Sequence, residues 1–305
     1  MNRNIHTVTG AFGYTGGYVA RKLIERGEVV ETLTNSPHKQ EQNSVLVNAV
    51  HPLNFKNEGS LVEALQSTKV LYNTYWVRFN HSWFNHGEAV ENTFKLFDAA
   101  KKAGVERVVH VSITKADKDS SLDYFRGKGE IEEYLKNLGV SYTIVRPAVL
   151  FGGEDILLNN IAWSLRTLPV MGIPGSGKYS LQPIYIDDFA DILVDAGSAE
   201  GNSTLAALGE ERYSYIDLLR LIKTKLNLKT PLLPLPNAVA WFGAKMIGMF
   251  LNDVLLTWAE IKGLQQETLW EDAAPLGKKK LSEWLDENKE ALGISYHNEL
   301  NRRRK

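Results

Sequence analysis

Three side chains in the middle of the chain are of the types that assist hydride transfer: Ser112, Tyr124 and Lys128. Tyr124 and Lys128 are four residues apart, so a helix over 124–138 would place both on one face, about one turn apart. An ammonium beside a phenol favours the phenolate and lowers the tyrosine pKa from about 10 toward the range of a general acid or base. Ser112 ends an apolar strand over 107–111, from which its hydroxyl can bond to a substrate oxygen. The alternative is a surface tyrosine and a solvated lysine with no chemical role.

A glycine-rich turn near the start of the chain has the spacing of a dinucleotide site. It follows an apolar strand over 5–8 and precedes a helical pattern over 18–26, which is the context such a turn requires. Glycines there allow a tight turn and a close backbone approach to a pyrophosphate, while the first helical N–H groups face the anion. The alternative is a turn of no chemical importance. The predicted cofactor contacts in this turn are Gly10, Phe12, Gly13, Tyr14, Thr15 and Gly16.

Alternating strands and helices must position these residues. Strand-like segments lie near Ile5, Val29, Val45, Val70, Val108 and Tyr142, and helical patterns near Gly17, Leu61, Gly87 and Gly129. This alternation predicts an α/β fold of Rossmann type, a doubly wound parallel sheet with helices on both faces. We expect a nucleotide-binding domain over 1–150. We expect a substrate-pocket and mostly helical region over 151–305, interleaved with the sheet around 180–205.

The order of these motifs resembles the short-chain dehydrogenase/reductase superfamily, in its extended and atypical branches, over roughly residues 5–195. The resemblance rests on the glycine turn, segment 70–74, Ser112, the Tyr124/Lys128 pair, Arg146-Pro147 and segment 182–188. It implies that Ser112, Tyr124 and Lys128 form a catalytic triad, and that Lys128 also holds the nicotinamide ribose. Asn73 and Pro147 are further predicted cofactor contacts. Similarity is greatest to the group with the nucleotide-binding accessory subunit of respiratory complex I and the NmrA-like redox sensors, whose members do not all catalyse.

The end of the second predicted strand bears on the choice between NADP and NAD. An acid there would bind the ribose 2′-hydroxyl, whereas a basic residue would suit a 2′-phosphate. By the glycine spacing of the superfamily, Thr34 stands where NAD-preferring members carry an acid and Asn35 where many NADP-preferring members carry arginine. NADP is therefore preferred over NAD, and Thr34, Asn35 and Ser36 are predicted contacts. The same residues also fit an ordinary polar turn around Pro37.

Composition narrows the class of protein. The 305 residues carry a net charge of -1, which gives no reason to expect a nucleic-acid partner, and contain no cysteine, which excludes disulfides and thiolate metal sites. We expect a small-molecule substrate and no metal. No apolar run is long enough to span a membrane and no signal segment follows Met1, so a cytoplasmic location is expected. Nothing in the sequence indicates the oligomeric state.

Aromatic residues gather in two other places. Segments 75–81 and 83–86 follow the fourth strand, where they would border cofactor or substrate or simply close a core. Segment 238–251 is unusually apolar, with Lys245 as its one charge. It fits a buried helix closing the core, which is the favoured interpretation, or the wall of an apolar, quinone-like substrate site. It also fits a helix that docks on a membrane surface or a protein partner.

Helix caps are expected at several polar residues. Asp187 or Asp188 would cap a helix over 189–196, and Ser214 one over 215–227. Thr257 and Glu260 form a plausible capping box, and Ser282 would begin a helix that ends near Gly293.

These observations favour an NAD(P)(H)-dependent oxidoreductase acting on a carbonyl/alcohol pair, with Tyr124 as acid/base, Lys128 as modifier of its pKa and Ser112 as orienter of the substrate oxygen. One alternative is an NAD-dependent nucleotide-sugar epimerase or dehydratase. Another is an accessory or redox-sensor protein whose NAD(P)(H) is bound and not turned over. The intact Ser/Tyr/Lys set opposes the accessory role, and the apolar helix near Trp241 favours it.

Overall fold

The computed structural model describes residues 5–40 and 45–303. The chain divides into two compact units, one made of Met1–Pro147 with Ile186–Ala207 and one of Ala148–Tyr185 with Leu208–Lys305. No helix within the described residues is long and apolar enough to cross a membrane.

The first unit is built on a seven-stranded parallel sheet in the order β11-β6-β5-β4-β1-β2-β3. The expected Rossmann-type fold is therefore confirmed. In such a sheet the carboxyl ends of all strands share one edge, which is where ligands bind. The strands are β1 (Ile5–Thr9), β2 (Val29–Thr34), β3 (Ala49–Pro52), β4 (Thr68–Asn73), β5 (Arg107–Val111), β6 (Ser141–Pro147) and β11 (Ser203–Ala207).

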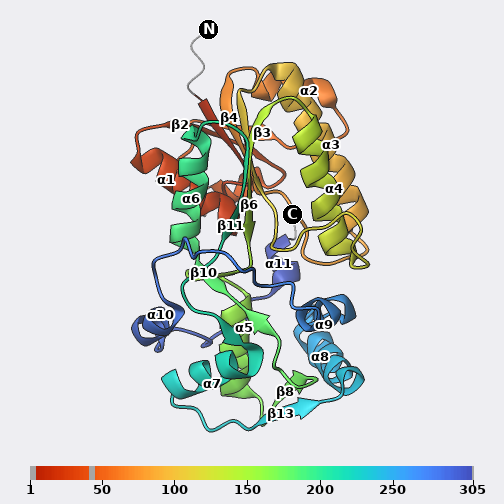
Figure 1. Cartoon of the computed structure of the whole chain (residues 1–305), viewed down its shortest axis with the longest axis vertical. Helices are drawn as coiled ribbons and strands as arrows, with labels where there is room; N and C mark the ends of the chain where they lie inside the picture. Colours follow the sequence, from red (N-terminus) through yellow and green to blue (C-terminus); the bar gives the residue numbers. More distant parts are fainter. Residues whose placement is uncertain (1–4, 41–44, 304–305) are drawn as a thin grey trace. The chain divides into compact units, whose positions relative to one another are not determined.

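Helices cover both faces of this sheet (Figure 1). Helices α1 and α6 pack together on one face, whereas α2, α3 and α4 pack side by side on the other. Leu33, Leu71, Leu96 and Ile131 belong to one buried apolar cluster of this unit. The helices are α1 (Tyr14–Glu25), the 3-10 helix η1 (Pro37–Gln40), α2 (Glu58–Leu65), α3 (His86–Ala103), α4 (Asp123–Asn137) and α6 (Ile186–Ser198).

Two local expectations for this unit are corrected. The third strand begins at Ala49, four residues after Val45, and the side chain of Asn48 just before it accepts a hydrogen bond from the Val30 N–H at 2.9 Å. Helix α6 begins at Ile186, so Asp187 and Asp188 lie inside its first turn and do not precede it. Asp187 instead forms an ion pair with Lys22 of α1 at 2.7 Å, which fixes the two helices together.

The return of the chain through 186–207 is tied to the sheet by a buried arginine. The Arg107 guanidinium of β5 donates to the backbone oxygens of Ala196 at 2.8 Å and Gly201 at 3.0 Å. It also donates to the hydroxyls of Ser141 and Thr143 on β6. Because a buried charge is costly unless its donors are satisfied, these bonds make segment 196–201 part of the first unit.

The second unit combines short strands with helices. Its strands pair as β10 with β7, β12 with β9 and β13 with β8. The elements are β7 (Val149–Phe151), α5 (Leu157–Thr167), β8 (Met171–Pro174), β9 (Ser180–Leu181), β10 (Pro183–Tyr185), β12 (Tyr213–Ser214), α7 (Tyr215–Lys225), β13 (Leu232–Leu235), α8 (Asn237–Leu251), α9 (Trp258–Gln265), α10 (Leu281–Asn288) and α11 (Glu299–Arg303).

The caps of these helices follow the sequence in two cases of three. The Ser214 hydroxyl accepts from the Asp217 N–H at 3.2 Å, and Thr257 and Glu260 form the expected capping box. The helix expected from Ser282 is α10, which begins one residue earlier at Leu281 and ends at Asn288, before Gly293; Ser282 does not cap it. The N–H and hydroxyl of Ser282 instead donate to the carboxylate of Glu211 at 2.9 and 2.6 Å.

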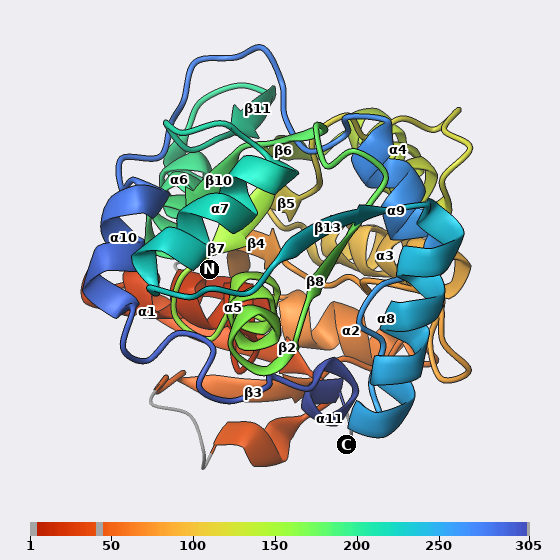
Figure 2. The same cartoon turned by 90° about the horizontal axis from the view of Figure 1, so that it is seen from below.

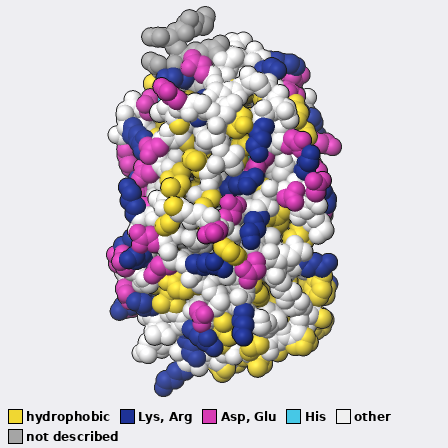
Figure 3. Space-filling model, viewed as in Figure 1, with side chains coloured by type: hydrophobic (Ala, Val, Ile, Leu, Met, Phe, Trp, Pro, Cys, Tyr) yellow, Lys and Arg dark blue, Asp and Glu magenta, His cyan; other side chains and the backbone are white. Residues whose placement is uncertain are grey.

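Helix α8 is not the buried helix that its composition favours. Only Ala240 and Gly248 are buried, whereas Phe242 is 60% and Phe250 86% exposed. Figure 2 shows α8 beside α9 and β8, and hydrophobic side chains gather over this region in Figure 3, unlike the mixed charges of the rest of that face. The interpretation of 238–251 as a core helix is therefore wrong.

Candidate functional site

The turn between β1 and α1 has the geometry expected of its glycines. Gly10 has a left-handed backbone (φ 69°) and its carbonyl accepts from the Gly13 N–H at 2.8 Å. A Cβ on Gly16 would lie 2.3 Å from the oxygen of Gly10, so only glycine lets α1 approach the strand this closely. No side chain caps α1 at Gly13, and the start of a helix is where backbone N–H groups can bind an anion.

The other predicted contacts around this turn differ in exposure. Phe12 is buried, Asn35 is exposed and Ser36 is half-buried. The Thr34 hydroxyl accepts from the Ser36 N–H at 3.0 Å, which shapes the end of β2. Glu31, earlier on the same strand, bonds to the His51 ring at 2.9 Å, which holds its carboxylate on β3.

Asn73 is fully buried and joins three strands at the carboxyl edge of the sheet. Its Oδ1 accepts from the Thr9 hydroxyl at 3.2 Å and from the Tyr75 N–H at 3.1 Å, while its Nδ2 donates to His110 Nδ1 at 3.1 Å. Burial lowers the pKa of His110 well below its usual value, helped by the charge of Lys128, which suits a neutral ring that accepts at Nδ1. The predicted contact of Asn73 with a cofactor stays a prediction.

Ser112 is bonded to a buried carboxylate. Its hydroxyl donates to Glu132 Oε1 at 2.6 Å, and Arg146 forms two bonds with the same carboxylate at 2.8 and 2.6 Å. The Glu132 side chain is only 2% exposed, so this fork-like pairing is what makes its burial tolerable. Sequence reasoning missed Glu132, although its place one helical turn after Lys128 is a signal that the two side chains share a face.

Lys128 is almost completely covered. Its Nζ donates to the backbone oxygen of Val111 at 2.7 Å and lies 4.4 Å from the centre of the Trp76 ring. Burial lowers the pKa of Lys128 to about 7, although the nearby charge of Glu132 opposes this shift. The side chain therefore changes charge near neutral pH, which is the range of a general acid or base.

Tyr124 and Lys128 both contact one aromatic cluster, at the Trp76 ring. Its ring packs edge-on against Trp76 with centroids 5.6 Å apart and against His86 at 5.5 Å. Trp76 and His86 stack nearly parallel at 5.6 Å. The structure thus brings Tyr124 and Lys128 to one indole, and places Ser112 next to the Val111 carbonyl that holds Lys128. Sequence reasoning placed Trp76 in an aromatic segment but gave it no part in this cluster.

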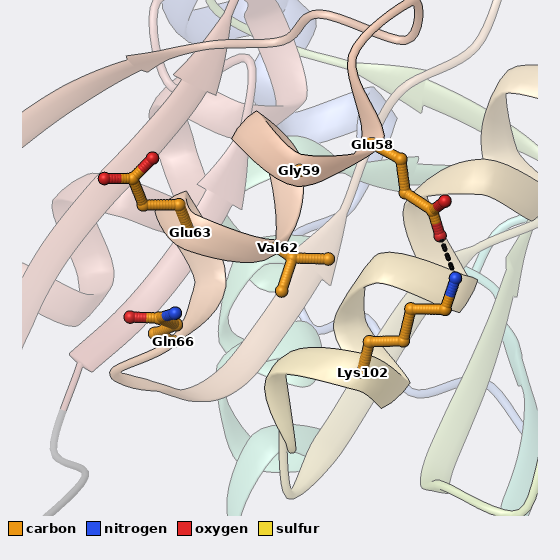
Figure 4. Close-up of a pocket in the computed structure, with 6 residues that line it drawn as sticks. All are labelled: Glu58, Gly59, Val62, Glu63, Gln66 and Lys102. Atoms are coloured by element: carbon orange, nitrogen blue, oxygen red, sulfur yellow. Dashed lines mark hydrogen bonds and ion pairs between the residues drawn. The ribbon is translucent and has the colours of Figure 1, made fainter.

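A surface pocket lies elsewhere in the same unit, between α2 and α3 (Figure 4). It is lined by Glu58, Gly59, Val62, Glu63, Gln66 and Lys102. Lys102 and Glu58 form an ion pair within this lining. None of the predicted site residues lines this pocket.

Residues 10–159 match the model of a family described as NAD(P)H-binding. This range covers most of the first unit, up to the end of β6, and continues into β7 and the start of α5. The matched range contains the glycine turn and the cluster of Ser112, Tyr124 and Lys128. The expected cofactor class, NADP(H) or NAD(H), is thereby confirmed.

Relatives of the chain are named as mitochondrial subunits of NADH dehydrogenase or NADH-ubiquinone oxidoreductase. The chain is 28% identical to subunit 9 of the NADH dehydrogenase [ubiquinone] 1 alpha subcomplex, mitochondrial, of Mus musculus, over 80% of this chain and 67% of that protein. It is 25% identical to the mitochondrial 40 kDa subunit of NADH-ubiquinone oxidoreductase of Neurospora crassa, over 82% of this chain and 66% of that protein. The chain thus spans about two thirds of the length of these relatives, and the expected similarity to the accessory subunit is confirmed.

Solved structures share the fold. An Escherichia coli NADPH-dependent quinone oxidoreductase in complex with NADPH matches with a TM-score of 0.75 at 20% identity, over 92% of this chain and 99% of that chain. A triphenylmethane reductase of Citrobacter sp. in complex with NADP(H) matches with a TM-score of 0.74 at 15% identity, over the same shares. At these identities the likeness concerns the fold.

Proposed function

We propose that the chain is an NAD(P)(H)-dependent oxidoreductase that reduces a carbonyl or oxidises an alcohol, with NADP preferred. The observation that carries this proposal is the meeting of Tyr124 and Lys128 at Trp76, within an NAD(P)H-binding domain. Tyr124 acts as the acid or base, and Lys128 favours its phenolate and holds the nicotinamide ribose. The bound dinucleotide supplies or accepts the hydride.

Two features of the cluster support these roles. A lysine whose pKa lies at about 7 gains or loses its charge with little free energy, so it can adjust the acidity of a neighbouring phenol at neutral pH. Ser112 lies one residue beyond the Val111 carbonyl that binds Lys128. For its hydroxyl to orient a substrate oxygen, the bond from Ser112 to Glu132 has to open, and the carboxylate then keeps its two bonds from Arg146.

The test combines binding and turnover. NADPH and NADH are titrated by fluorescence, and oxidation of the reduced cofactor is followed with a panel of carbonyl compounds and quinones. Tyr124→Phe should lower turnover by about a hundredfold or more and leave the cofactor affinity within about twofold, because only the transferred proton is lost. Tyr134→Phe is the matched control, since Tyr134 lies on the same helix and donates to Asp98 at 2.6 Å. Equal turnover of Tyr124→Phe and wild type would contradict the role of Tyr124.

A second function is favoured by a specific observation. The hydroxyl of Ser112 is bonded to Glu132 and the ammonium of Lys128 is covered, so neither group is open to a substrate, and a domain that only binds a dinucleotide needs neither. The relatives named as NADH dehydrogenase subunits point to the same role, an accessory protein held by protein partners. Tight binding of NADPH with no oxidation by any member of the panel would favour this role over the enzyme.

A further inference from the structure

Lys128 is covered by one side chain that the sequence motifs do not include. The Trp76 ring centre lies 4.4 Å from its Nζ, which donates a hydrogen bond to the Val111 carbonyl at 2.7 Å, and the lysine is 2% exposed. An ammonium enclosed in this way cannot contact a ribose hydroxyl. The indole is the part of this enclosure that a side-chain rotation can remove, because Val111 is fixed in the sheet.

The Trp76 ring packs closely against two neighbours, His86 and Gly127. It stacks on His86 with an interplanar angle of 6°, and it lies over a helical residue without a side chain, Gly127. A Cβ on Gly127 would come within 3.1 Å of Trp76 Cη2 and 2.8 Å of Val90 Cγ2, so the glycine is what admits the indole. These contacts define one position of the ring over Lys128, which we call the closed position.

The closed position has a cost that a ligand could relieve. The Trp76 Nε1–H is buried and has no hydrogen-bond partner among the residues that the structure describes. Leaving a buried donor unsatisfied is unfavourable, so the indole gains a hydrogen bond if it turns toward an acceptor. The ribose hydroxyls and the carboxamide oxygen of a nicotinamide nucleotide are acceptors of this kind.

We propose that Trp76 is a positioning residue that closes over Lys128 and must move aside before this lysine contacts a bound nicotinamide ribose. The proposal rests on the function proposed above, since it assigns Lys128 to the cofactor. It adds a residue from the loop after β4 to the site and makes cofactor binding depend on an opening step. The apparent affinity for NADPH is then reduced by the fraction of molecules whose indole is open.

The direct test is the chemical accessibility of Lys128. Limiting acetic anhydride labels lysines, and peptide mass spectrometry compares Lys128 with Lys136, which lies on the same helix with a side chain 41% exposed. Replacing the indole by an aliphatic group, Trp76→Leu, should raise labelling of Lys128 about tenfold, because a desolvated cation–π contact is lost. Trp76→Phe keeps an aromatic face and should stay within about threefold of wild type. Trp83→Leu, a change at a 58% exposed tryptophan of the same loop, should leave labelling unchanged.

A second variant displaces the indole without altering it. In Gly127→Ala, the new methyl group meets Trp76 and Val90, so labelling of Lys128 should also rise. Gly59→Ala is the matched control, because its nearest neighbour would be Asn57 Oδ1 at 3.5 Å in helix α2. Both variants are compared by circular dichroism, and a rise seen only in an unfolded variant would count against the proposal.

Cofactor protection separates the two proposals. In Trp76→Leu, saturating NADPH should suppress labelling of Lys128, and NADPH should bind about tenfold more tightly than in wild type because no closed state competes. Labelling of Lys128 at the wild-type level in both Trp76→Leu and Gly127→Ala would overturn the covering role and leave the proposed oxidoreductase standing. Increased labelling that NADPH does not suppress would instead overturn the contact of Lys128 with the cofactor.

Discussion

The glycine turn after β1 and the cluster after β5 lie at the same edge of one sheet, yet they are built from different groups. The turn consists of backbone, and its shape depends on Gly10 and Gly16 having no side chain. The cluster consists of side chains, and two of its polar groups have already bonded within the protein: Ser112 to Glu132, and Lys128 to the Val111 carbonyl. We expect both sites to contact the same dinucleotide.

This difference teaches how each site prepares for a ligand. Backbone N–H groups at a helix start cannot turn away, so the glycine turn keeps its geometry whether or not an anion is bound. In the cluster, Ser112 and Lys128 are buried and bonded within the protein, so they have to exchange partners when a ligand arrives. We therefore expect substitutions in the turn to change both stability and cofactor binding. Substitutions in the cluster should change the protonation of its side chains and the exchange of their hydrogen-bond partners.

The largest effect is expected at the turn. Gly16→Ala places a Cβ 2.3 Å from the Gly10 oxygen, and neither backbone segment can yield. Unfolding by urea should show a loss of about 3 kcal/mol or more, together with loss of NADPH binding. Gly59→Ala, in an open helical position, should cost nothing and gain up to about 1 kcal/mol. If Gly16→Ala bound NADPH like wild type, the close packing of α1 would not matter for the site.

In the cluster, the largest effect is expected at Glu132. Glu132→Gln removes the charge that faces Arg146 and Ser112, and should lower the free energy of unfolding by about 2 kcal/mol. Loss of this anion should also lower the pKa of Lys128 further, since Glu132 raises it. Glu133→Gln is the control, because that carboxylate is half exposed and pairs with Lys118. Equal unfolding curves for the two variants would show that the pairing of Glu132 is unimportant.

The pH dependence of stability separates buried ionisable groups of the two units. Burial raises the pKa of Asp155 from 3.8 to about 7, so its contribution to stability is fully present below pH 3.8 and is lost as pH rises to about 7. Burial lowers the pKa of Lys128 from 10.5 to about 7, so its contribution is present above pH 10.5 and is lost as pH falls to about 7. Asp155→Asn should flatten the acidic limb of the stability curve, and Lys128→Met the alkaline limb. If the free energy of unfolding changed with pH in the same way in both variants, this assignment would be refuted.

The smallest effect is expected on α8, which contributes no residue to either site. Phe250 is 86% exposed, so Phe250→Ser should change the free energy of unfolding by less than about 0.5 kcal/mol. Its cofactor affinity should equal that of wild type. Leu251→Ser, at a half-buried position of the same helix, serves as the comparison and should cost more. A large loss of stability in Phe250→Ser would mean that this ring is covered by something in solution.

The parts of the molecule that could be predicted from sequence are those fixed by local rules. The glycine turn, the helix that carries Tyr124 and the capping box at Thr257 each depend on residues within a few positions of one another. Other contacts depend on how strands and helices come together. Ser112 pairs with Glu132, which is 20 residues away, and the Trp76 ring packs on Gly127. No local pattern encodes such contacts. The exposure of α8 was misjudged because an apolar composition does not say whether the same chain covers the helix.

The discontinuity of the first unit has a consequence for how its boundaries are drawn. The family match ends at residue 159, but the edge strand β11 and the helix α6 come from 186–207. A fragment that stops at 159 would leave the edge of β6 without its neighbour and the buried guanidinium of Arg107 without the Ala196 and Gly201 oxygens. Such an edge pairs readily with other chains, so the fragment should aggregate. The segment that matches the family model is therefore shorter than the stretch of chain that the first unit needs to fold.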